Sequence, residues 1–137
     1  MNREISIKAA NNTHHNRTLV VADDCQDNLT FIGFILDNLN LRYYLARNGQ
    51  TALDLVREQK PSLVLLDVVM PSLNGIEVNV LIKNNPSTSH IPTIAITALS
   101  ELEHLASIKN AGFNDYLIKP FMIEELEIKL QQFLKID

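Results

Sequence analysis

The sequence predicts an α/β fold in which a parallel sheet is covered by helices on both faces. Five short apolar runs alternate along the chain with five longer segments whose apolar residues recur at helical spacing. Such alternation favours parallel strands joined by right-handed crossovers. Four prolines, Pro61, Pro71, Pro92 and Pro120, fall between the predicted elements.

The predicted strands are the apolar runs at residues 18–22, 42–46, 63–67, 93–97 and 115–118. The predicted helices lie at residues 26–39, 49–59, 75–84, 101–111 and 122–135. The second strand is less apolar than the first, third and fourth, so we expect it at an edge of the sheet. Residues 18–137 would then form one domain, and the polar residues 1–17 are expected to be a mobile N-terminal tail.

Length and composition exclude several classes of protein. A chain of 137 residues with 46% hydrophobic and 20% charged residues is an ordinary globular domain. Its net charge of −4 argues against nucleic-acid binding or an anionic membrane as partner. No apolar run approaches the roughly 20 residues of a membrane span. The N-terminus lacks the pattern of a signal peptide, and Cys25 is the only cysteine, so the cytoplasm is the expected location.

Polar side chains follow four of the predicted strands, where each strand ends. Asp23 and Asp24 follow the first strand, Asp67 ends the third, Thr97 ends the fourth and Lys119 follows the fifth. The carboxyl ends of parallel strands share one edge, where ligands bind at the point of strand reversal. Clustered carboxylates repel one another unless a cation neutralises them, and Mg²⁺ suits oxygen ligands of this number. The set therefore indicates a magnesium site that handles a phosphoryl group.

Each of these residues also has a plainer explanation when taken alone. Asp23 and Asp24 could be solvated loop acids, Thr97 an ordinary β-branched strand residue, and Lys119 a side chain that extends to solvent. Their coincidence at matching strand ends is what favours a shared site. The isomer of the Lys119–Pro120 peptide bond stays open at this stage.

The motifs at these strand ends are VVADD at residues 20–24, LLDVVMP at 65–71 with NG at 74–75, TA at 97–98, and DYLIKP at 115–120. From about Thr18 to the C-terminus the chain resembles a bacterial response-regulator receiver domain of two-component signalling, similar to the chemotaxis regulators. The resemblance implies a flavodoxin-like (βα)5 fold, with a doubly wound parallel five-stranded sheet in the order 2-1-3-4-5.

The resemblance also implies a role for each acid. Asp67 would be the phosphoacceptor, and the donor would be the phosphohistidine of a sensor histidine kinase or histidine phosphotransfer protein. Asp24, Asp67 and the backbone carbonyl of Val69 would ligate Mg²⁺ directly, with Asp23 acting through water. The domain would be a signalling protein that catalyses only its own phosphorylation and dephosphorylation.

Thr97 and Lys119 would bind the phosphoryl oxygens, and Tyr116 would be the aromatic switch that turns inward when Thr97 moves. The fourth helix, fifth strand and fifth helix would form the output surface, which could bind an unknown downstream protein or form a homodimer. Because the chain ends just past the fifth helix, we expect a single-domain regulator. A receiver fragment of a longer regulator is the alternative.

Two apolar residues stand near the predicted site. Val69 lies two residues past Asp67, and Leu99 lies two past Thr97. In the family these positions influence how water reaches the acyl phosphate. Neither side chain can orient an attacking water, so we hypothesise a long-lived phosphorylated state.

The first predicted helix carries more apolar residues than one core stripe needs. That stripe comprises Phe31, Ile32, Ile35, Leu36 and Leu39. Leu29 and Phe34 lie off it, with Gly33 between them. In receiver domains this helix docks on the phosphate donor, so we predict that Leu29 and Phe34 flank a docking patch. The alternative is that Phe34 folds back onto the sheet or is a lone exposed aromatic.

Two rival functions stay open. A flavodoxin shares this architecture but needs a phosphate loop after the first strand, and the acidic loop at residues 23–27 would repel a cofactor phosphate. A receiver-like scaffold that is never phosphorylated would usually lack part of the acidic and basic set, whereas all five residues are present here.

Overall fold

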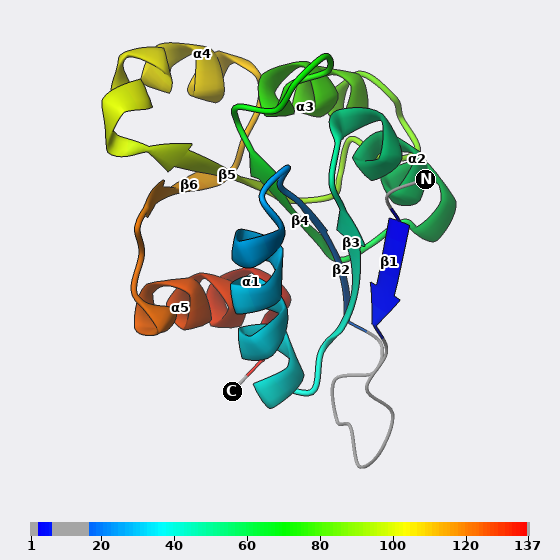
Figure 1. Cartoon of the computed structure of the whole chain (residues 1–137). Coiled ribbons are helices and arrows are strands. Elements are labelled where there is room, and N and C mark those ends of the chain that lie inside the picture. The colour runs from blue at the N-terminus through cyan, green and yellow to red at the C-terminus, as the bar shows by residue number, and fades with distance from the viewer. Residues whose placement is uncertain (1–2, 7–16, 137) are drawn as a thin grey trace.

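Five parallel strands form the centre of the structure, and helices cover both faces of the sheet (Figure 1). The computed structural model describes residues 3–6 and 17–136, with the backbone alone at residues 3–6, 102 and 104. The parallel strands are β2 (Thr18–Ala22), β3 (Arg42–Ala46), β4 (Leu63–Asp67), β5 (Thr93–Ala98) and β6 (Asp115–Lys119). Their order, β3-β2-β4-β5-β6, is the predicted 2-1-3-4-5 order, so the flavodoxin-like fold is confirmed.

The α-helices are α1 (Gln26–Asn38), α2 (Gly49–Gln59), α3 (Gly75–Lys83), α4 (Leu105–Asn110) and α5 (Ile123–Leu134). The helices α1 and α5 lie on one face of the sheet, and α2 and α3 lie on the other (Figure 1). The predicted helix at residues 101–111 differs in detail, because a 3₁₀ helix, η1 (Leu99–His104), precedes a short α4. A tighter helical turn therefore follows directly on the end of β5.

An additional strand lies beside β3. This strand, β1 (Arg3–Ser6), pairs antiparallel with β3, with Arg3 opposite Ala46 and Ser6 opposite Tyr43. Four residues of the predicted N-terminal tail thus form a strand in the structure, while residues 1–2 and 7–16 of that tail lie outside the described residues. The prediction that β3 is an edge strand is wrong for the whole sheet, although β3 is outermost among the parallel strands. An unpaired strand edge is a template for an extended segment, and four residues are too few to reveal such pairing in sequence.

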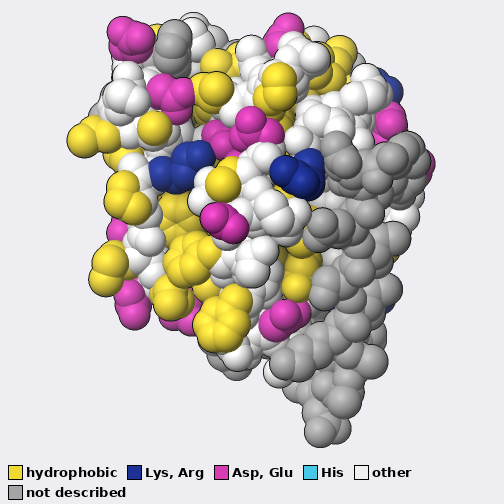
Figure 2. Space-filling view, viewed as in Figure 1, with side chains coloured by type: hydrophobic (Ala, Val, Ile, Leu, Met, Phe, Trp, Pro, Cys, Tyr) yellow, Lys and Arg dark blue, Asp and Glu magenta, His cyan; other side chains and the backbone are white. Residues whose placement is uncertain are grey.

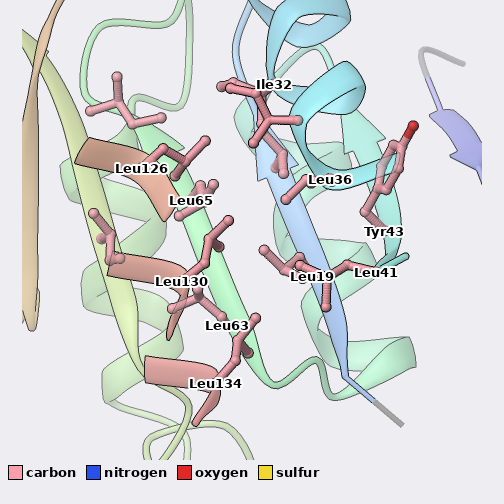
Figure 3. Close-up of a cluster of buried hydrophobic side chains, with 14 of the residues drawn as sticks. Leu19, Ile32, Leu36, Leu41, Tyr43, Leu63, Leu65, Leu126, Leu130 and Leu134 are labelled. Carbon is pink, nitrogen blue, oxygen red and sulfur yellow. The ribbon is translucent and has the colours of Figure 1, made fainter. Parts of the chain in front are cut away.

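Alternate residues of the central strands are buried on opposite faces. On β2, Leu19 and Val21 belong to the core beneath α1 and α5, whereas Val20 and Ala22 belong to the core beneath α2 and α3. Figure 3 shows Leu19 among leucines of β4 and α5 in the first of these cores. Burial on both faces explains the continuous apolar runs in the sequence. It also fixes the strand ends rigidly, and those ends carry the polar residues.

Candidate functional site

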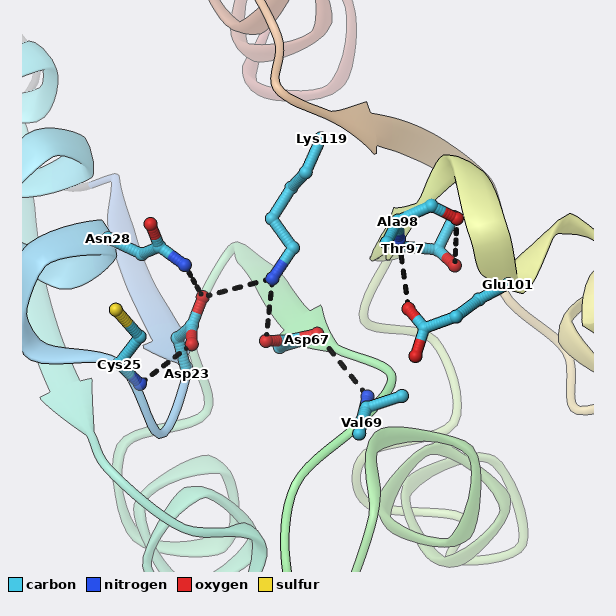
Figure 4. A network of polar contacts seen from close by, with 9 residues as sticks. All are labelled: Asp23, Cys25, Asn28, Asp67, Val69, Thr97, Ala98, Glu101 and Lys119. Atoms are coloured by element: carbon cyan, nitrogen blue, oxygen red, sulfur yellow. Dashed lines mark hydrogen bonds and ion pairs between the residues drawn. The ribbon is translucent and has the colours of Figure 1, made fainter.

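The strand ends bring the predicted acids and the lysine together. Asp23 directly follows β2, Asp67 is the last residue of β4, and Lys119 is the last residue of β6. Carboxylate oxygens of Asp23, Asp24 and Asp67 all lie within 4.8 Å of one another. Lys119 Nζ lies 3.0 Å from Asp67 Oδ2 and 3.8 Å from Asp23 Oδ2. Figure 4 shows the lysine reaching across to both carboxylates.

The electrostatics of this group are unfavourable for ionised Asp67. The side chain is buried, with 3% of its residue surface exposed. Burial raises the pKa of the Asp67 carboxyl to about 7, the charge of Asp23 adds to this rise, and the hydrogen bond from Lys119 opposes it. Burial alone would lower the pKa of the Lys119 ammonium, but its hydrogen bond to Asp67 and nearby carboxylates raise it above the usual value. The site thus carries a charge conflict that a further cation would relieve.

Asp23 is fixed by hydrogen bonds to both of its oxygens. The backbone N–H of Cys25 donates to Oδ1 at 2.9 Å, and Asn28 Nδ2 donates to Oδ2 at 3.1 Å. Asp23 is fully buried, whereas Asp24 beside it is exposed. Sequence reasoning missed Asn28. Its spacing from Asp23, one turn into the following helix, is the signal that could have identified it.

The backbone after Asp67 is packed closely against the start of α3. Val69 N donates to Asp67 Oδ1 at 3.3 Å, and Gly75 N donates to Val68 O at 3.0 Å. A Cβ atom on Gly75 would lie 2.2 Å from the carbonyl oxygen of Asp67, so only glycine allows this approach. Asn74 begins the helix with a capping box completed by Glu77. The Asn-Gly pair therefore holds the loop that carries Val69.

Thr97 and Tyr116 lie on neighbouring strands of the sheet, with Thr97 opposite Ile118 and Tyr116 opposite Ala95. Thr97 is fully buried, and its hydroxyl lies 3.5 Å from the carbonyl oxygen of Ala98. Tyr116 is half-buried and packs against a small cluster that includes Ala95 and Ile108. The Ala98 N–H donates to Oε1 of Glu101, a residue that sequence reasoning did not select. The capping spacing of three residues is the signal for that contact.

The donor set fits Mg²⁺. Three carboxylates supply oxygen ligands, which a hard divalent cation prefers, and no nitrogen or sulfur ligand is part of the cluster that the described residues form. The raised pKa of the buried Asp67 carboxyl shows independently that added positive charge would be favourable there. The backbone carbonyl of Val69 is the predicted fourth ligand, and Val69 follows two residues after Asp67.

A pocket opens beside these residues, between α1 and the segment after β6. Its volume is about 380 Å³, and it is lined by Asp23, Asn28, Phe31, Ile32, Ile96, Lys119, Pro120 and Phe121. The Lys119–Pro120 peptide bond is cis. The rings of Phe31 and Phe121 lie 6.0 Å apart between centroids, with their planes tilted by 47°. Figure 2 shows hydrophobic side chains gathered over α1 and toward α5 on this face.

The predicted docking patch on α1 needs correction. Leu29 is fully buried in the core, and Gly33 is buried against the Tyr43 hydroxyl, so neither forms an exposed patch. Phe34 is 60% exposed as predicted, and Phe31, placed in the core stripe, is 40% exposed. The helix is rotated relative to the predicted stripe because its sheet-facing line passes through residues 29, 32 and 36. The exposed aromatic surface of α1 is therefore formed by Phe31 and Phe34.

This strand order, with an acid cluster and a lysine at the point of strand reversal, defines a signalling domain that accepts a phosphoryl group. The chain belongs to the response regulator receiver domain family, whose model matches residues 19–131. Receiver domains of this family act in two-component systems, and they bind Mg²⁺ at an acidic site. This family membership excludes the alternative that the chain is a flavodoxin.

Three similar proteins illustrate the family. A probable cyclic di-GMP phosphodiesterase of Vibrio cholerae is 37% identical over 118 residues, which are 86% of this chain and 26% of that protein. The chain thus spans about a quarter of that relative's length. The receiver domain of sensor histidine kinase PA1611 from Pseudomonas aeruginosa, solved with magnesium in its active-site cleft, is 29% identical with a TM-score of 0.81. The match covers 88% of this chain and 98% of that one.

The third is a complex from Saccharomyces cerevisiae. It contains the histidine phosphotransfer protein Ypd1 and the receiver domain of the response regulator Ssk1. This chain is 26% identical to the matched chain, with a TM-score of 0.78 and coverage of 85% of this chain and 88% of the other. Receiver domains therefore interact with histidine kinases or phosphotransfer proteins. In the part of this chain that the structure describes, no helix is long and apolar enough to cross a bilayer.

Proposed function

We propose that Asp67 accepts the phosphoryl group in this receiver domain. The observation that carries the proposal is the contact of its buried carboxylate with Lys119 at 3.0 Å, inside a cluster of three aspartates. Transfer would break the P–N bond of a donor phosphohistidine and form a P–O bond to Asp67, with the bond electrons and a proton going to the imidazole. Lys119 would bind one phosphoryl oxygen, and after a local movement the Thr97 hydroxyl would donate a hydrogen bond to another phosphoryl oxygen.

The metal ligands would be Asp24, Asp67 and the carbonyl of Val69. Both Asp23 oxygens already accept hydrogen bonds, which supports a role for Asp23 through water. When bound, Mg²⁺ would neutralise the carboxylates and the charge of the transferred group. The exposed side chain of Asp24 and the buried side chain of Asp67 leave one open side, toward solvent and an approaching donor.

The test is labelling by a small phosphodonor such as acetyl phosphate, followed by intact-protein mass spectrometry. We expect a mass gain of one phosphoryl group that requires Mg²⁺ and is absent in Asp67→Asn. The matched control is Asp54→Asn, which makes the same change on α2, outside the cluster, and should be labelled like the wild type. Equal labelling of Asp67→Asn would reject Asp67 as acceptor, and no labelling of any variant would favour the unphosphorylated scaffold.

The phosphate donor would dock on the exposed aromatic surface of α1. Phe34 is 60% exposed, and Phe31 lines the pocket that reaches Asp23 and Lys119. The complex of Ypd1 with a similar receiver domain supports a histidine phosphotransfer protein or a sensor kinase as the donor. Exposed aromatic side chains beside a reactive group suit the centre of such an interface.

Phe34→Ala should slow phosphotransfer from the cognate donor about tenfold while leaving labelling by acetyl phosphate unchanged. Ile128→Ala on α5 removes an equally exposed apolar side chain and serves as the control. If Phe34→Ala transfers phosphate at the wild-type rate, the docking surface is elsewhere.

The output surface would be formed by α4, β6 and α5. Met122 and Ile128 are both exposed there, and Tyr116 lies half-buried at its border. Phosphorylation would move Thr97 and Tyr116 and so change this surface, for a downstream protein or for a second copy of the chain. Sedimentation of the protein with and without beryllofluoride, a phosphoryl mimic, distinguishes the two outcomes. A shift to the dimer mass indicates self-association.

A further inference from the structure

The amide at the end of β5 is already bound to an anion. The backbone N–H of Ala98 donates to Glu101 Oε1 at 3.0 Å, and Glu101 lies three residues further along, in η1. This spacing is half of a capping box, in which a carboxylate reaches back to the residue before the helix. Ala98 has no side-chain oxygen to complete the box, whereas Asn74 and Glu77 at α3 complete theirs. The contact at β5 therefore depends on the Glu101 carboxylate alone.

Ala98 lies at the edge of the sheet where the phosphoryl group would arrive. Asp67 is in register with Ile96 on β5, and Ala98 is in register with Lys119 on β6. The Ala98 amide is thus one residue beyond Thr97 and beside the lysine. Figure 4 shows Glu101 on the opposite side of Asp67 from Asp23, with its carboxylate directed at the β5 end.

We infer that Glu101 is an internal competitor of the phosphoryl group, holding the Ala98 amide in the unphosphorylated state and releasing it when Asp67 is modified. This inference rests on the proposed role of Asp67 and adds a residue that sets how readily the domain is switched. A phosphoryl group carries about two negative charges at neutral pH, so it repels the Glu101 carboxylate and offers stronger acceptor oxygens. Both effects favour exchange of the amide from Glu101 to the phosphoryl group.

Two further observations support competition. The charge of Glu101 contributes to the raised pKa of the Lys119 ammonium, so the carboxylate also acts on the lysine that would bind the phosphoryl group. The segment that Glu101 caps joins Thr97 to α4, and α4 belongs to the proposed output surface. Release of the cap would therefore free the segment that links the site to that surface.

The experiment is an equilibrium titration with beryllofluoride at saturating Mg²⁺, followed by tyrosine fluorescence, since the chain has three tyrosines and no tryptophan. Glu101→Ala should bind beryllofluoride about five- to tenfold more tightly than the wild type, the factor expected for removal of one competing hydrogen bond. Glu101→Gln keeps an acceptor oxygen without the charge and should show a smaller gain. In each variant the Ala98 amide resonance should shift on binding.

Glu103→Ala is the matched control, because it removes the same charge from the same 3₁₀ helix at an exposed position. An equal gain in this variant would show that only the local net charge matters, and it would overturn the inference. Unchanged or weaker binding by Glu101→Ala would also overturn it, because a purely structural cap predicts that result. Failure of the wild type to bind beryllofluoride would instead reject the proposed function, so the two failures are distinguishable.

Discussion

Replacement of Asp67 by asparagine should stabilise the metal-free protein at alkaline pH. The folded state holds the Asp67 carboxyl at a pKa of about 7, against a starting value of 3.8, so the folded state binds this proton more tightly than the unfolded state does. The free energy of unfolding therefore falls as the pH rises from about 4 to about 7, and it stays low at higher pH. Asparagine has no proton to lose, so this fall should disappear in the variant.

The magnitude follows from the size of the shift. About three pKa units correspond to at most about 4 kcal/mol in the free energy of unfolding. The variant also loses the ion pair with Lys119, whose partly exposed ammonium can turn to water, which reduces the net gain to about 2 kcal/mol. The raised pKa of Lys119 reflects this same ion pair, and its contribution to stability is lost only well above pH 8, so it is already included in the reduction above and is not counted again.

The assay is urea denaturation in EDTA at pH 5 and at pH 8. We expect the free energy of unfolding of Asp67→Asn to exceed that of the wild type by about 2 kcal/mol at pH 8 and to differ little from it at pH 5. Asp54→Asn on α2 controls for the loss of one carboxylate. If Asp67→Asn is no more stable than the wild type at pH 8, then ionised Asp67 does not destabilise the folded protein, and the reasoning fails.

Three further predictions concern the surroundings of Asp67, the proposed acceptor. Gly75→Ala should lower the free energy of unfolding, measured by urea denaturation, by about 2 kcal/mol, because the new Cβ would displace the backbone of Asp67. If the variant is as stable as the wild type, the loop adapts to the added methyl group. Asp24→Asn should weaken Mg²⁺ binding at least about tenfold in calorimetric titration, whereas unchanged binding would remove it from the ligands. Val69 and Leu99 are both exposed beside the site, and their joint replacement by Asn and Glu should speed phosphate release about tenfold by orienting water. An unchanged half-life of the acyl phosphate would end the hypothesis of a long-lived state.

The sequence predicted the sheet because its strands are buried on both faces. In a chain of alternating elements, a short apolar run such as the one that ends at Asp67 is interpreted as a buried strand, and the structure has β4 at Leu63–Asp67. Once strand order was fixed, the acids and Lys119 had to converge, since parallel strands present their carboxyl ends at one edge. The bonding of Asp23, Asp67 and Lys119 could thus be anticipated from topology.

Other features depend on tertiary geometry that a pattern does not carry. The rotation of α1 decides that Leu29 is buried and Phe31 exposed, and a shift of one residue along a helix turns a side chain by about 100°. The pairing of Arg3–Ser6 with β3 joins segments about forty residues apart. Asn28 and Glu101 act through single hydrogen bonds, whose donors are identified only when the backbone positions are known.

The chemistry of the site explains why its resting state is held by replaceable contacts. Two buried carboxylates, Asp23 and Asp67, face each other across one lysine, and burial opposes the charge of Asp67. A fold that fully satisfied Asp67 with permanent donors would lower its need for a metal and leave no donor for a phosphoryl group. Lys119 and the Ala98 amide instead bind protein carboxylates in the resting state, and both can transfer to a stronger anion on Asp67. In the proposed switch, the driving free energy would then come from exchanging internal carboxylate partners for the phosphoryl group, and not from creating new donors.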